Sequence, residues 1–408
     1  MLDSEKQVVV KFGGSVLEGG SAILRAAEAI KRESSLGHKI LVVASAMKGT
    51  TDKLLSMAKT ISPDISTEAT DHIIALGEEE SVRLMTAALK SLGLDAVEVT
   101  PNSAYWPIVT DETFGDANPL LDECKKRTEE KIIPLLREGK IPVVCGFVGR
   151  SFSGKTTTIG RGGSDTTAVL LANCLGAEEL VLVKDVAGIY SADPDKVLDA
   201  KPIEGLEAEE AYILSSTGAK VLHSKVFKYK PEELKIRIVS NNGKLTEGGT
   251  VIHGKVPDLQ VESYKRPIIM ITIIGNIFEN PEALTQISQG IMKKDAKILS
   301  VVVDERAVIL YVDGDPLEVL REVHSLVNPK NNLKAVTDSE GLSLISIKGR
   351  DLGATPGMIQ KVTTPLADKG INIYGLLTNF THNSICILVK SERAIEALKS
   401  IKNVLGVN

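Results

Sequence analysis

Short apolar runs alternate with longer helical segments along roughly the first 256 residues of the chain. The runs are rich in β-branched residues and almost continuously hydrophobic, which is typical of parallel strands covered on both faces. One helix is expected to begin at Asn118-Pro119, since Asn can cap a helix and Pro suits its first position, and to end before Gly139. This alternation predicts a three-layer α/β domain with a largely parallel sheet. Its buried strands are expected at Val8–Lys11, Lys39–Ala44, Ile141–Gly146, Leu180–Lys184 and Ile236–Val239.

Beyond Pro257 the pattern changes to a strand–helix–strand–strand–helix unit that occurs twice. The first copy begins with a strand at Ile268–Gly275, and the second begins with a strand at Leu342–Gly349. Turn residues separate the two copies at Asn328–Asn332. Within the second copy we expect a strand at Ile371–Leu377, and after it a last strand at Val404–Val407.

Composition narrows the class of protein. The 408 residues are 43% hydrophobic and 25% charged, which is typical of a globular protein of two or three domains. A net charge of −5 gives no reason to expect nucleic acid or an anionic membrane as a partner. No apolar run reaches the length of a membrane span, the first residues lack the apolar core of a signal peptide, and the four scattered cysteines form no CxxC pair. We therefore expect a cytoplasmic protein in a reducing compartment, without disulfides.

The segment Thr158–Thr166, TIGRGGSDT, is the strongest chemical motif of the chain. It follows a predicted strand and precedes an apolar helical pattern, so its backbone amides lie at a helix start, which is a ready site for an anion. Arg161 adds a planar fork suited to a carboxylate or a phosphate. The segment is not a Walker loop, because no Lys-Ser/Thr pair follows the glycines.

Other turns carry weaker signals, and each has an ordinary structural reading. Lys11 is followed by two glycines, which can bring amides close to a phosphate but also occur in many turns. Ser45 and Thr51 lie beyond the second strand, where a helix cap is the simpler interpretation. The acidic run Glu78–Glu80 is read either as a solvated helix face or as a source of one inward carboxylate for an ammonium group. The turn at Thr110-Asp111 is consistent with a structural Asx turn. The six histidines show no metal-ligand spacing, so no metal site built by the protein is expected.

Taken in order, the segments KFGGSV, SAM, GE, TDETFG, IPVVCGFVG, TIGRGGSD, DVAGIYSADP and GAKVLH resemble the aspartate kinases of the amino-acid kinase superfamily. The resemblance covers about residues 7–255, and the repeat after it resembles a pair of regulatory ACT domains. It implies a catalytic domain of the amino-acid kinase fold at residues 1–258, followed by two ferredoxin-like βαββαβ domains at residues 259–332 and 333–408. Other superfamily members (acetylglutamate, glutamate or uridylate kinase) and a non-catalytic amino-acid sensor are the alternatives.

The resemblance also implies roles for particular residues, with ATP, Mg²⁺ and L-aspartate as the small molecules. Catalysis would rest on Lys11, which neutralises the transferring phosphoryl group, and on Asp165, which orients Lys11. Arg161 would bind the α-carboxylate of aspartate and Glu78 its ammonium group, in a pocket completed by Ser45, Thr51, Gly162 and Ser164. The nucleotide would be bound by Lys11, Gly13, Gly14, Ser15, Lys184, Asp185, Tyr190, Asp193 and Lys220. Mg²⁺ would be held mainly by the phosphates of ATP and by water.

The chain departs from the family pattern at three places. The family usually reads KFGGTSV, so the loop after Lys11 is one residue shorter here. Lys184 stands where the family usually has threonine, and an inward Lys184 could alter nucleotide choice. Asp195 replaces the arginine of the usual DPR, so that a basic phosphate contact is lost or moved to Lys196.

The ACT-like repeat implies a homodimer and an amino-acid effector, with lysine, threonine and methionine as candidates. The second copy keeps a glycine-rich turn, so we expect an effector site around Gly353, Gly357, Met358, Asn383 and Ser384. The alternative is that both copies serve only to dimerise the protein.

Overall fold

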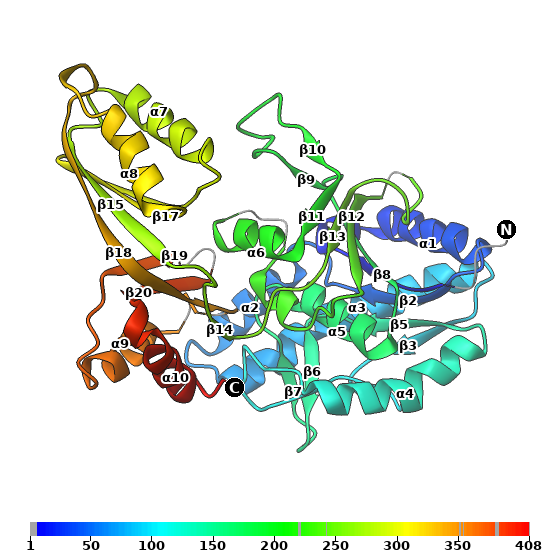
Figure 1. Cartoon of the computed structure of the whole chain (residues 1–408). Helices are drawn as coiled ribbons and strands as arrows, with labels where there is room; N and C mark the ends of the chain where they lie inside the picture. Colours follow the sequence, from blue (N-terminus) through cyan, green and yellow to red (C-terminus); the bar gives the residue numbers. More distant parts are fainter. Residues whose placement is uncertain are drawn as a thin grey trace. The chain divides into compact units, whose positions relative to one another are not determined.

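The computed structural model describes residues 6–218, 222–241, 243–350, 352–353, 355–379 and 383–407. The chain divides into two units, Met1–Val256 and Pro257–Asn408, and each is described by itself (Figure 1).

A sheet of eight strands forms the centre of the first unit, in the order β11-β13-β12-β8-β1-β2-β5-β3. Neighbouring strands run parallel except β12 and β13. All five strands expected from the sequence are present, and they occupy adjacent central positions, where burial on both faces requires continuous apolar runs. The bounds are β1 Gln7–Phe12, β2 Lys39–Ala44, β3 Ala96–Val99, β5 Ile141–Cys145, β8 Glu179–Lys184, β11 Gly205–Glu207, β12 Lys235–Ser240 and β13 Thr250–His253.

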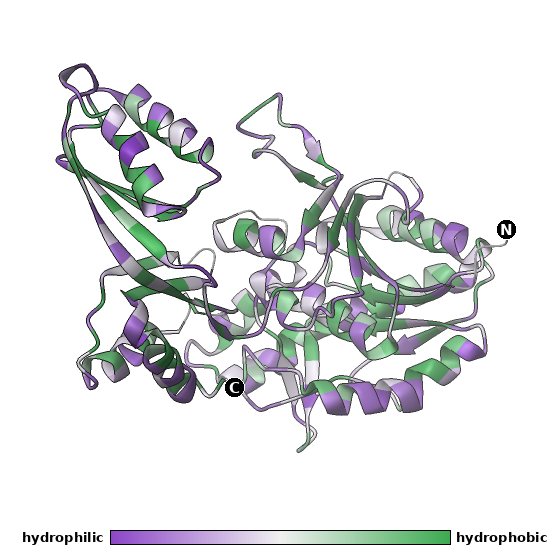
Figure 2. Cartoon of the chain, in the orientation of Figure 1, coloured by the Kyte–Doolittle hydropathy of each residue, from purple (hydrophilic) through white to green (hydrophobic). Residues whose placement is uncertain are grey.

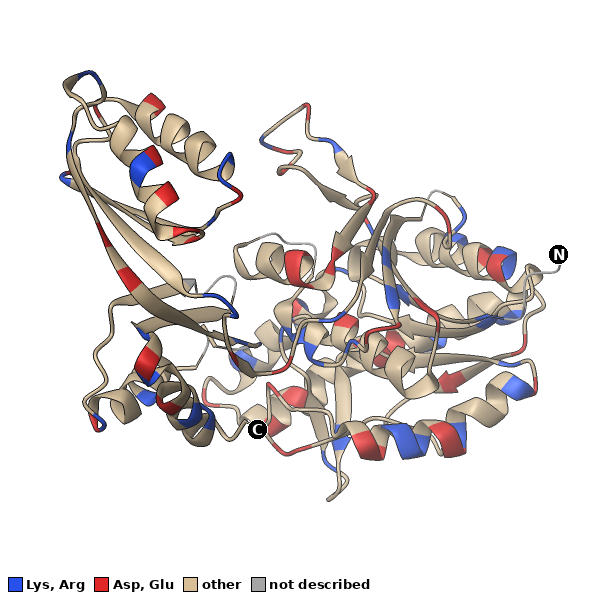
Figure 3. Ribbon diagram, in the orientation of Figure 1, with Lys and Arg blue, Asp and Glu red and all other residues tan. Residues whose placement is uncertain are grey.

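The helices of this unit cover the sheet in packed groups, with α1 and α2 against α3 and with α4 against α5. Most of α5 is buried and apolar, whereas α4 carries charges of both signs on its exposed side (Figures 2 and 3). The predicted start of α4 is wrong by two residues, because Asn118 bonds to Asp111 and Pro119 bridges to Thr110. The bounds are α1 Gly20–Ser35, α2 Thr50–Ile61, α3 Thr67–Ser91, α4 Leu121–Arg137, α5 Gly163–Leu175 and α6 Ala208–Ser216.

Short elements join this framework to the glycine-rich turns. Strands β4 (Val109–Thr110), β6 (Val148–Ser151) and β7 (Thr156–Thr158) form a small sheet, and β7 leads directly into the GRGG turn before α5. Strands β9 (Ile189–Tyr190) and β10 (Pro202–Ile203) pair beyond the end of β8.

In the second unit, the described residues form one sheet of seven strands, in the order β16-β17-β15-β18-β20-β19 with β14 also paired to β18. The predicted order of strands and helices is confirmed for both copies of the repeat. Two expectations are wrong: β19 begins at Gly375 rather than Ile371, and α10 continues to Leu405 where a last strand was expected. The bounds are β14 Gln260–Ser263, β15 Ile268–Gly275, α7 Pro281–Met292, β16 Lys297–Val303, β17 Ala307–Asp313, α8 Pro316–Ser325, β18 Leu333–Lys348, α9 Met358–Ala367, β19 Gly375–Asn379, β20 Ser384–Lys390 and α10 Ala394–Leu405.

One long strand, β18, belongs to both copies. Its first half pairs antiparallel with β15 of the first copy, from Leu333 opposite Gly275 to Leu342 opposite Ile268. Its second half pairs with β20 on one side and with β14 on the other. Strand β14 precedes the first copy in the chain but completes the sheet of the second. The expected boundary between two ACT-like domains at residue 332 stays a prediction. Both β14 and β15, which precede this boundary, pair with β18, which follows it.

Candidate active site

Lys11 and Lys184 share the carboxylate of Asp165 at one edge of the central sheet. The Lys11 Nζ lies 2.7 Å from Asp165 Oδ1, and the Lys184 Nζ lies 2.9 Å from Asp165 Oδ2. The two lysines stand near the carboxyl ends of the paired parallel strands β1 and β8, and Asp165 comes from the first turn of α5. The expected contact between Lys11 and Asp165 is therefore present, and Lys184 points inward as well.

Burial and charge act against each other in this group. Burial lowers the pKa of Lys11, and the neighbouring Lys184 adds to that effect, while Asp165 opposes it. Burial alone would raise the pKa of Asp165, but the two ammonium groups and their hydrogen bonds hold it well below its usual range. Two ammonium groups and one carboxylate leave one excess positive charge at the end of the sheet, which suits a phosphate.

The glycine turn after Lys11 closes against the neighbouring strand ends. The Gly13 amide donates to the Val183 carbonyl at 3.0 Å, and the Lys48 amide donates to the Gly14 carbonyl at 3.1 Å. A β-carbon on Gly14 would lie 2.5 Å from the Ala46 carbonyl oxygen, so only glycine fits this approach. Ser15 follows within a single 3-10 turn. The shortened loop thus still lies directly beside Lys11.

Glu78 is the acid of its run that turns inward, with 3% of its surface exposed. Glu79 is partly exposed and pairs with Arg83 at 2.7 Å, and Glu80 is exposed. Burial raises the pKa of Glu78 to about 8, although a hydrogen bond from the Ala46 backbone lowers it. Ser45, which is also buried, is the residue before Ala46, and its amide reaches the Phe12 carbonyl at 3.3 Å. The structure therefore brings the Ser45 turn, Glu78 and the Lys11 group together.

Gly77 explains how α3 approaches this turn. A β-carbon there would lie 3.0 Å from the Ala46 β-carbon and 3.2 Å from the Thr50 Cγ2. Thr51 is the next residue of α2 and is half-buried. The small residue lets the two helices pack closely beside Glu78.

The side chain of Arg161 is exposed, and it lies on a loop between two glycines of constrained backbone conformation. Gly160 and Gly162 on either side of it have φ of +78° and +68°, a left-handed conformation that favours glycine. Gly162 caps α5, and Ser164 in its first turn packs on Gly146, where a β-carbon would lie 2.7 Å from the Ser164 Cβ. Arg161 is thus exposed at the start of α5, whereas the Gly163 amide is held by the Gly160 carbonyl at 3.0 Å.

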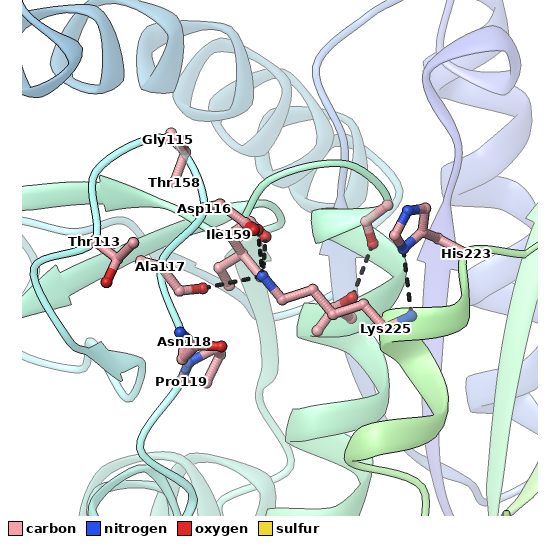
Figure 4. A network of polar contacts seen from close by, with 12 residues as sticks. Thr113, Gly115, Asp116, Ala117, Asn118, Pro119, Thr158, Ile159, His223 and Lys225 are labelled. Carbon is pink, nitrogen blue, oxygen red and sulfur yellow. Dashed lines mark hydrogen bonds and ion pairs between the residues drawn. The ribbon is translucent and has the colours of Figure 1, made fainter. Parts of the chain in front are cut away.

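Two residues that sequence reasoning did not single out support this loop. Lys225, in a 3-10 helix at Ser224–Lys228, bonds to the Asp116 carboxylate and to the Ile159 carbonyl (Figure 4). Asp71 is 1% exposed and accepts from the Gly115 amide, the Thr158 amide and the Thr158 hydroxyl at 2.9, 2.9 and 2.7 Å. Burial raises the pKa of Asp71 against these three bonds. Its position two helical turns before Glu78, on one face of α3, is the signal that could have revealed it.

The residues expected at the nucleotide lie on the connection after β8. Asp185 and Asp193 are exposed and Tyr190 is half-buried. The Asp111 turn is the Asx turn allowed by the sequence, since its Oδ1 accepts from the Thr113 and Asn118 amides. Lys196 pairs with Asp193, at 3.6 Å on the surface. Lys220 lies outside the described residues.

The described residues include neither a metal cluster nor a membrane span. They contain no group of three or more His, Cys, Asp or Glu side chains that could hold a metal ion. None of their helices combines the length and the apolar character that a bilayer span requires. All four cysteines are free, and burial raises the pKa of each thiol.

Comparison with known proteins covers almost the whole chain. A model of the amino acid kinase family matches residues 6–240, and a model of the ACT domain matches residues 339–403. Aspartokinase of Bacillus sp. (strain MGA3) is 31% identical over 405 residues, which are 97% of this chain and 96% of the relative. Aspartokinase of Corynebacterium glutamicum is 31% identical over 400 residues, with 93% and 92% covered.

Solved structures agree on the fold. The crystal structure of aspartate kinase from Synechocystis matches with a TM-score of 0.79 and 24% identity, over 98% of this chain and 69% of that one. The structure of E. coli aspartokinase III in complex with aspartate and ADP matches with a TM-score of 0.56 and 24% identity, over 98% of this chain and 100% of that one. With its kinase fold, its ACT region and relatives of this similarity along nearly its full length, the chain belongs to the aspartokinases of the amino acid kinase family.

Proposed function

We propose that the protein transfers the γ-phosphoryl group of ATP to the side-chain carboxylate of L-aspartate, giving 4-phospho-L-aspartate and ADP. This reaction is the first step towards lysine, threonine and methionine. The carrying observation is the shared Asp165 carboxylate between Lys11 and Lys184, which leaves one positive charge beside the buried Glu78. Relatives named aspartokinase over nearly the full chain, and the aspartate and ADP of the E. coli complex, support this choice of substrates.

The nucleophile needs no general base in this reaction. A side-chain carboxylate with a pKa of about 4 is already ionised at neutral pH. One of its oxygens forms a bond to the γ-phosphorus while the bond from that phosphorus to the β–γ bridging oxygen breaks, and ADP leaves with the electron pair. Two anions must approach each other, so positioning and charge neutralisation supply the catalysis.

Each residue of the site has a role in that scheme. The Lys11 ammonium neutralises the transferring phosphoryl group, and Asp165 orients it from 2.7 Å. Lys184 adds a second cation at the start of the nucleotide loop, with Gly14 and Ser15 supplying amides. The Gly13 amide, expected to do the same, is instead held by the Val183 carbonyl. Asp185, Tyr190, Asp193 and Lys220 bind the rest of the nucleotide.

Aspartate is bound on the other side of the phosphoryl group. Arg161 forms a bidentate pair with its α-carboxylate, and Glu78 pairs with its ammonium group. Ser45, Thr51, Gly162 and Ser164 line the remaining pocket. Both Asp165 oxygens already face lysines, so Mg²⁺ would be held by the phosphates of ATP, where it would neutralise charge, rather than by a carboxylate cage.

The test is ATP-dependent formation of hydroxamate from the carboxylate substrates by the full chain, with release of ADP as the readout for UMP, whose phosphorylated product forms no hydroxamate. Aspartate should be turned over, and glutamate, acetylglutamate and UMP should not. Turnover of a control substrate without turnover of aspartate would reject the assignment in favour of another superfamily activity. No turnover with any of these four substrates would support the alternative that the protein is a non-catalytic amino-acid sensor.

Regulation by an amino acid is proposed for the second unit. A structure of E. coli aspartokinase III carries lysine and aspartate. In this chain the Asn383 side-chain oxygen accepts a hydrogen bond from the Gly353 amide at 3.3 Å. The backbone carbonyl of Asn383 accepts from the Gly349 amide at 3.1 Å. These contacts join two loops of the expected effector site, with Gly357 and Met358 at the start of α9 and Ser384 at the start of β20.

A competing location lies in the first copy. A groove of about 730 Å³ is lined there by polar and charged residues that include Asn276, Glu279, Arg306 and Lys334.

Calorimetry with lysine, threonine and methionine tests for an effector, and no heat with any of them would leave dimerisation as the role of the repeat. Light scattering tests the expected homodimer. The cytoplasmic location stays a prediction.

A further inference from the structure

The backbone on both sides of Arg161 is backed by side chains from distant segments. A β-carbon on Gly160 would lie 2.2 Å from the Asp116 carboxylate, and one on Gly162 would lie 2.3 Å from the His223 Cβ. Asp116 therefore fills the space behind the first glycine, and His223 fills the space behind the second. Arg161 therefore projects from a turn that is packed against another segment at the glycine on each side of it.

Lys225 binds to both of these supports (Figure 4). Its ammonium group donates to Asp116 Oδ1 at 2.6 Å, and its backbone amide donates to His223 Nδ1 at 3.3 Å. The same ammonium group donates to the Ile159 carbonyl at 2.6 Å and to the Ala117 carbonyl at 3.3 Å. Ile159 is the last residue before the Gly160-Arg161 turn, so the Lys225 side chain ties Asp116 to the backbone that leads into the turn, while its backbone amide holds His223.

The ammonium group of Lys225 is occupied by the protein itself. An ammonium has three donor hydrogens, and three acceptors lie around this one. Only 14% of the side chain is exposed, whereas its partner Asp116 is 72% exposed. Lys225 is therefore placed to hold the loop and not to touch substrate.

Holding a guanidinium in place has a definite consequence for binding. A substrate carboxylate gains two hydrogen bonds from Arg161 only when the fork is correctly oriented, and a preorganised fork avoids the entropy cost of ordering the loop. A displacement of about 1 Å at such a group can cost on the order of a hundredfold in rate. The benefit falls on the substrate that Arg161 binds and not on the nucleotide.

We propose that Lys225 is a positioning residue for aspartate, which acts by fixing the turn that carries Arg161. The proposal rests on the function proposed above. If the wild-type protein does not phosphorylate aspartate, that function fails; if it does and Lys225 has no effect on aspartate, only this inference fails.

The test compares Lys225→Met with Lys225→Arg and with Lys228→Met in the full chain. Lys228 lies on the same 3-10 helix and reaches Asn118 at 3.3 Å, so it is a matched lysine outside the contact set. Lys225→Met should raise the aspartate KM by about tenfold or more, with the ATP KM within about twofold of the wild type. Lys225→Arg should restore part of the loss, and Lys228→Met should leave both constants unchanged.

A double variant separates positioning of Arg161 from a general structural role. In an Arg161→Ala background the loop no longer carries the guanidinium, so Lys225→Met should raise the aspartate KM further by less than about twofold. An undiminished effect in that background, or an equal rise of the ATP KM, would overturn the proposal.

Asp116→Asn keeps the shape of an exposed side chain while removing the ion pair, and it should raise the aspartate KM by about threefold even if Lys225→Met does not fold. An unchanged KM in Asp116→Asn and Lys225→Arg would then count against the inference.

Discussion

The buried carboxyl group of Glu78 should make aspartate binding depend on pH. Burial raises its pKa from 4.5 to about 8, which corresponds to a cost of about 5 kcal/mol for ionising the group in the empty site. At pH 7 about one tenth of the molecules then carry the charge that an ammonium group requires. The aspartate KM should therefore fall about tenfold between pH 6 and pH 7 and level off above pH 8, while the aspartate amine stays protonated.

Glu78→Gln removes this dependence, because glutamine carries no proton to lose. Its aspartate KM should be the same at pH 6 and pH 8, and the loss relative to the wild type should grow as the pH rises. Glu79→Gln is the matched control, since Glu79 is the next residue but pairs with Arg83 near the surface. Initial rates of hydroxamate formation at saturating ATP provide the measurement. A wild-type KM that does not change between pH 6 and pH 7.5, or a slope that Glu78→Gln retains, would refute the role of Glu78.

The same substitution has a measurable effect on folding. The folded protein holds the Glu78 proton more tightly than the unfolded chain, so its contribution to stability is full below pH 4.5 and is lost as the pH rises towards 8. The wild type should lose up to about 1.4 kcal/mol per pH unit in that window relative to Glu78→Gln. Urea unfolding at pH 5 and pH 8 checks this, and a wild-type stability that does not fall relative to that of Glu78→Gln between the two pH values would contradict it.

Five other changes test the rest of the site. Lys11→Ala should abolish turnover while the protein remains folded, and near wild-type turnover would remove Lys11 from the mechanism. Asp165→Asn leaves two buried ammonium groups without their carboxylate, so urea unfolding should show a loss of about 3–5 kcal/mol; a loss below about 1 kcal/mol would mean that the pair is solvated. Lys184→Thr should raise the ATP KM without changing the aspartate KM, and the reverse pattern would place Lys184 at the other substrate. Gly160→Ala should destabilise the protein by about 1–3 kcal/mol through its positive φ and the contact with Asp116. Asp71→Ala leaves two backbone amides without an acceptor and should cost at least about 2 kcal/mol, and an unchanged unfolding midpoint would show that water replaces the carboxylate.

The fold could be predicted where burial leaves a continuous apolar run. The five central strands of the first sheet are of this kind. The first half of β18, which reads LKAVTDSEG, could not be predicted. Only Leu333 of these residues is buried, and the segment owes its strand conformation to pairing with β15. Strand β14 has only four residues and forms against the other half of β18, far along the chain.

The residue types of the candidate site could be predicted from the sequence, but the directions in which several of its side chains point could not. The pairing of Lys11 with Asp165 was expected from the resemblance, and the geometry agrees. That Lys184 turns to the same carboxylate depends on the register of β8 beside β1, which no local pattern encodes. The choice of Glu78 over its two acidic neighbours depends on which face of α3 meets the Ser45 turn. Lys225 escaped notice because the partners of its ammonium group, the Asp116 carboxylate and two backbone carbonyls, lie on other segments of the chain.

The path of β14 and β18 also bears on how the protein is made. Gln260 pairs with Lys348, so during synthesis β14 leaves the ribosome well before its partner strand exists. The first copy of the repeat is translated in between and can close as soon as the first half of β18 has emerged. The second copy must then close around an already folded insert, as the last event of synthesis. Nascent chains stalled so that the first half of β18, but not Lys348, has left the ribosome should therefore protect β15 to β17 from protease while β14 remains open to cleavage. Simultaneous protection of both copies would show a different order.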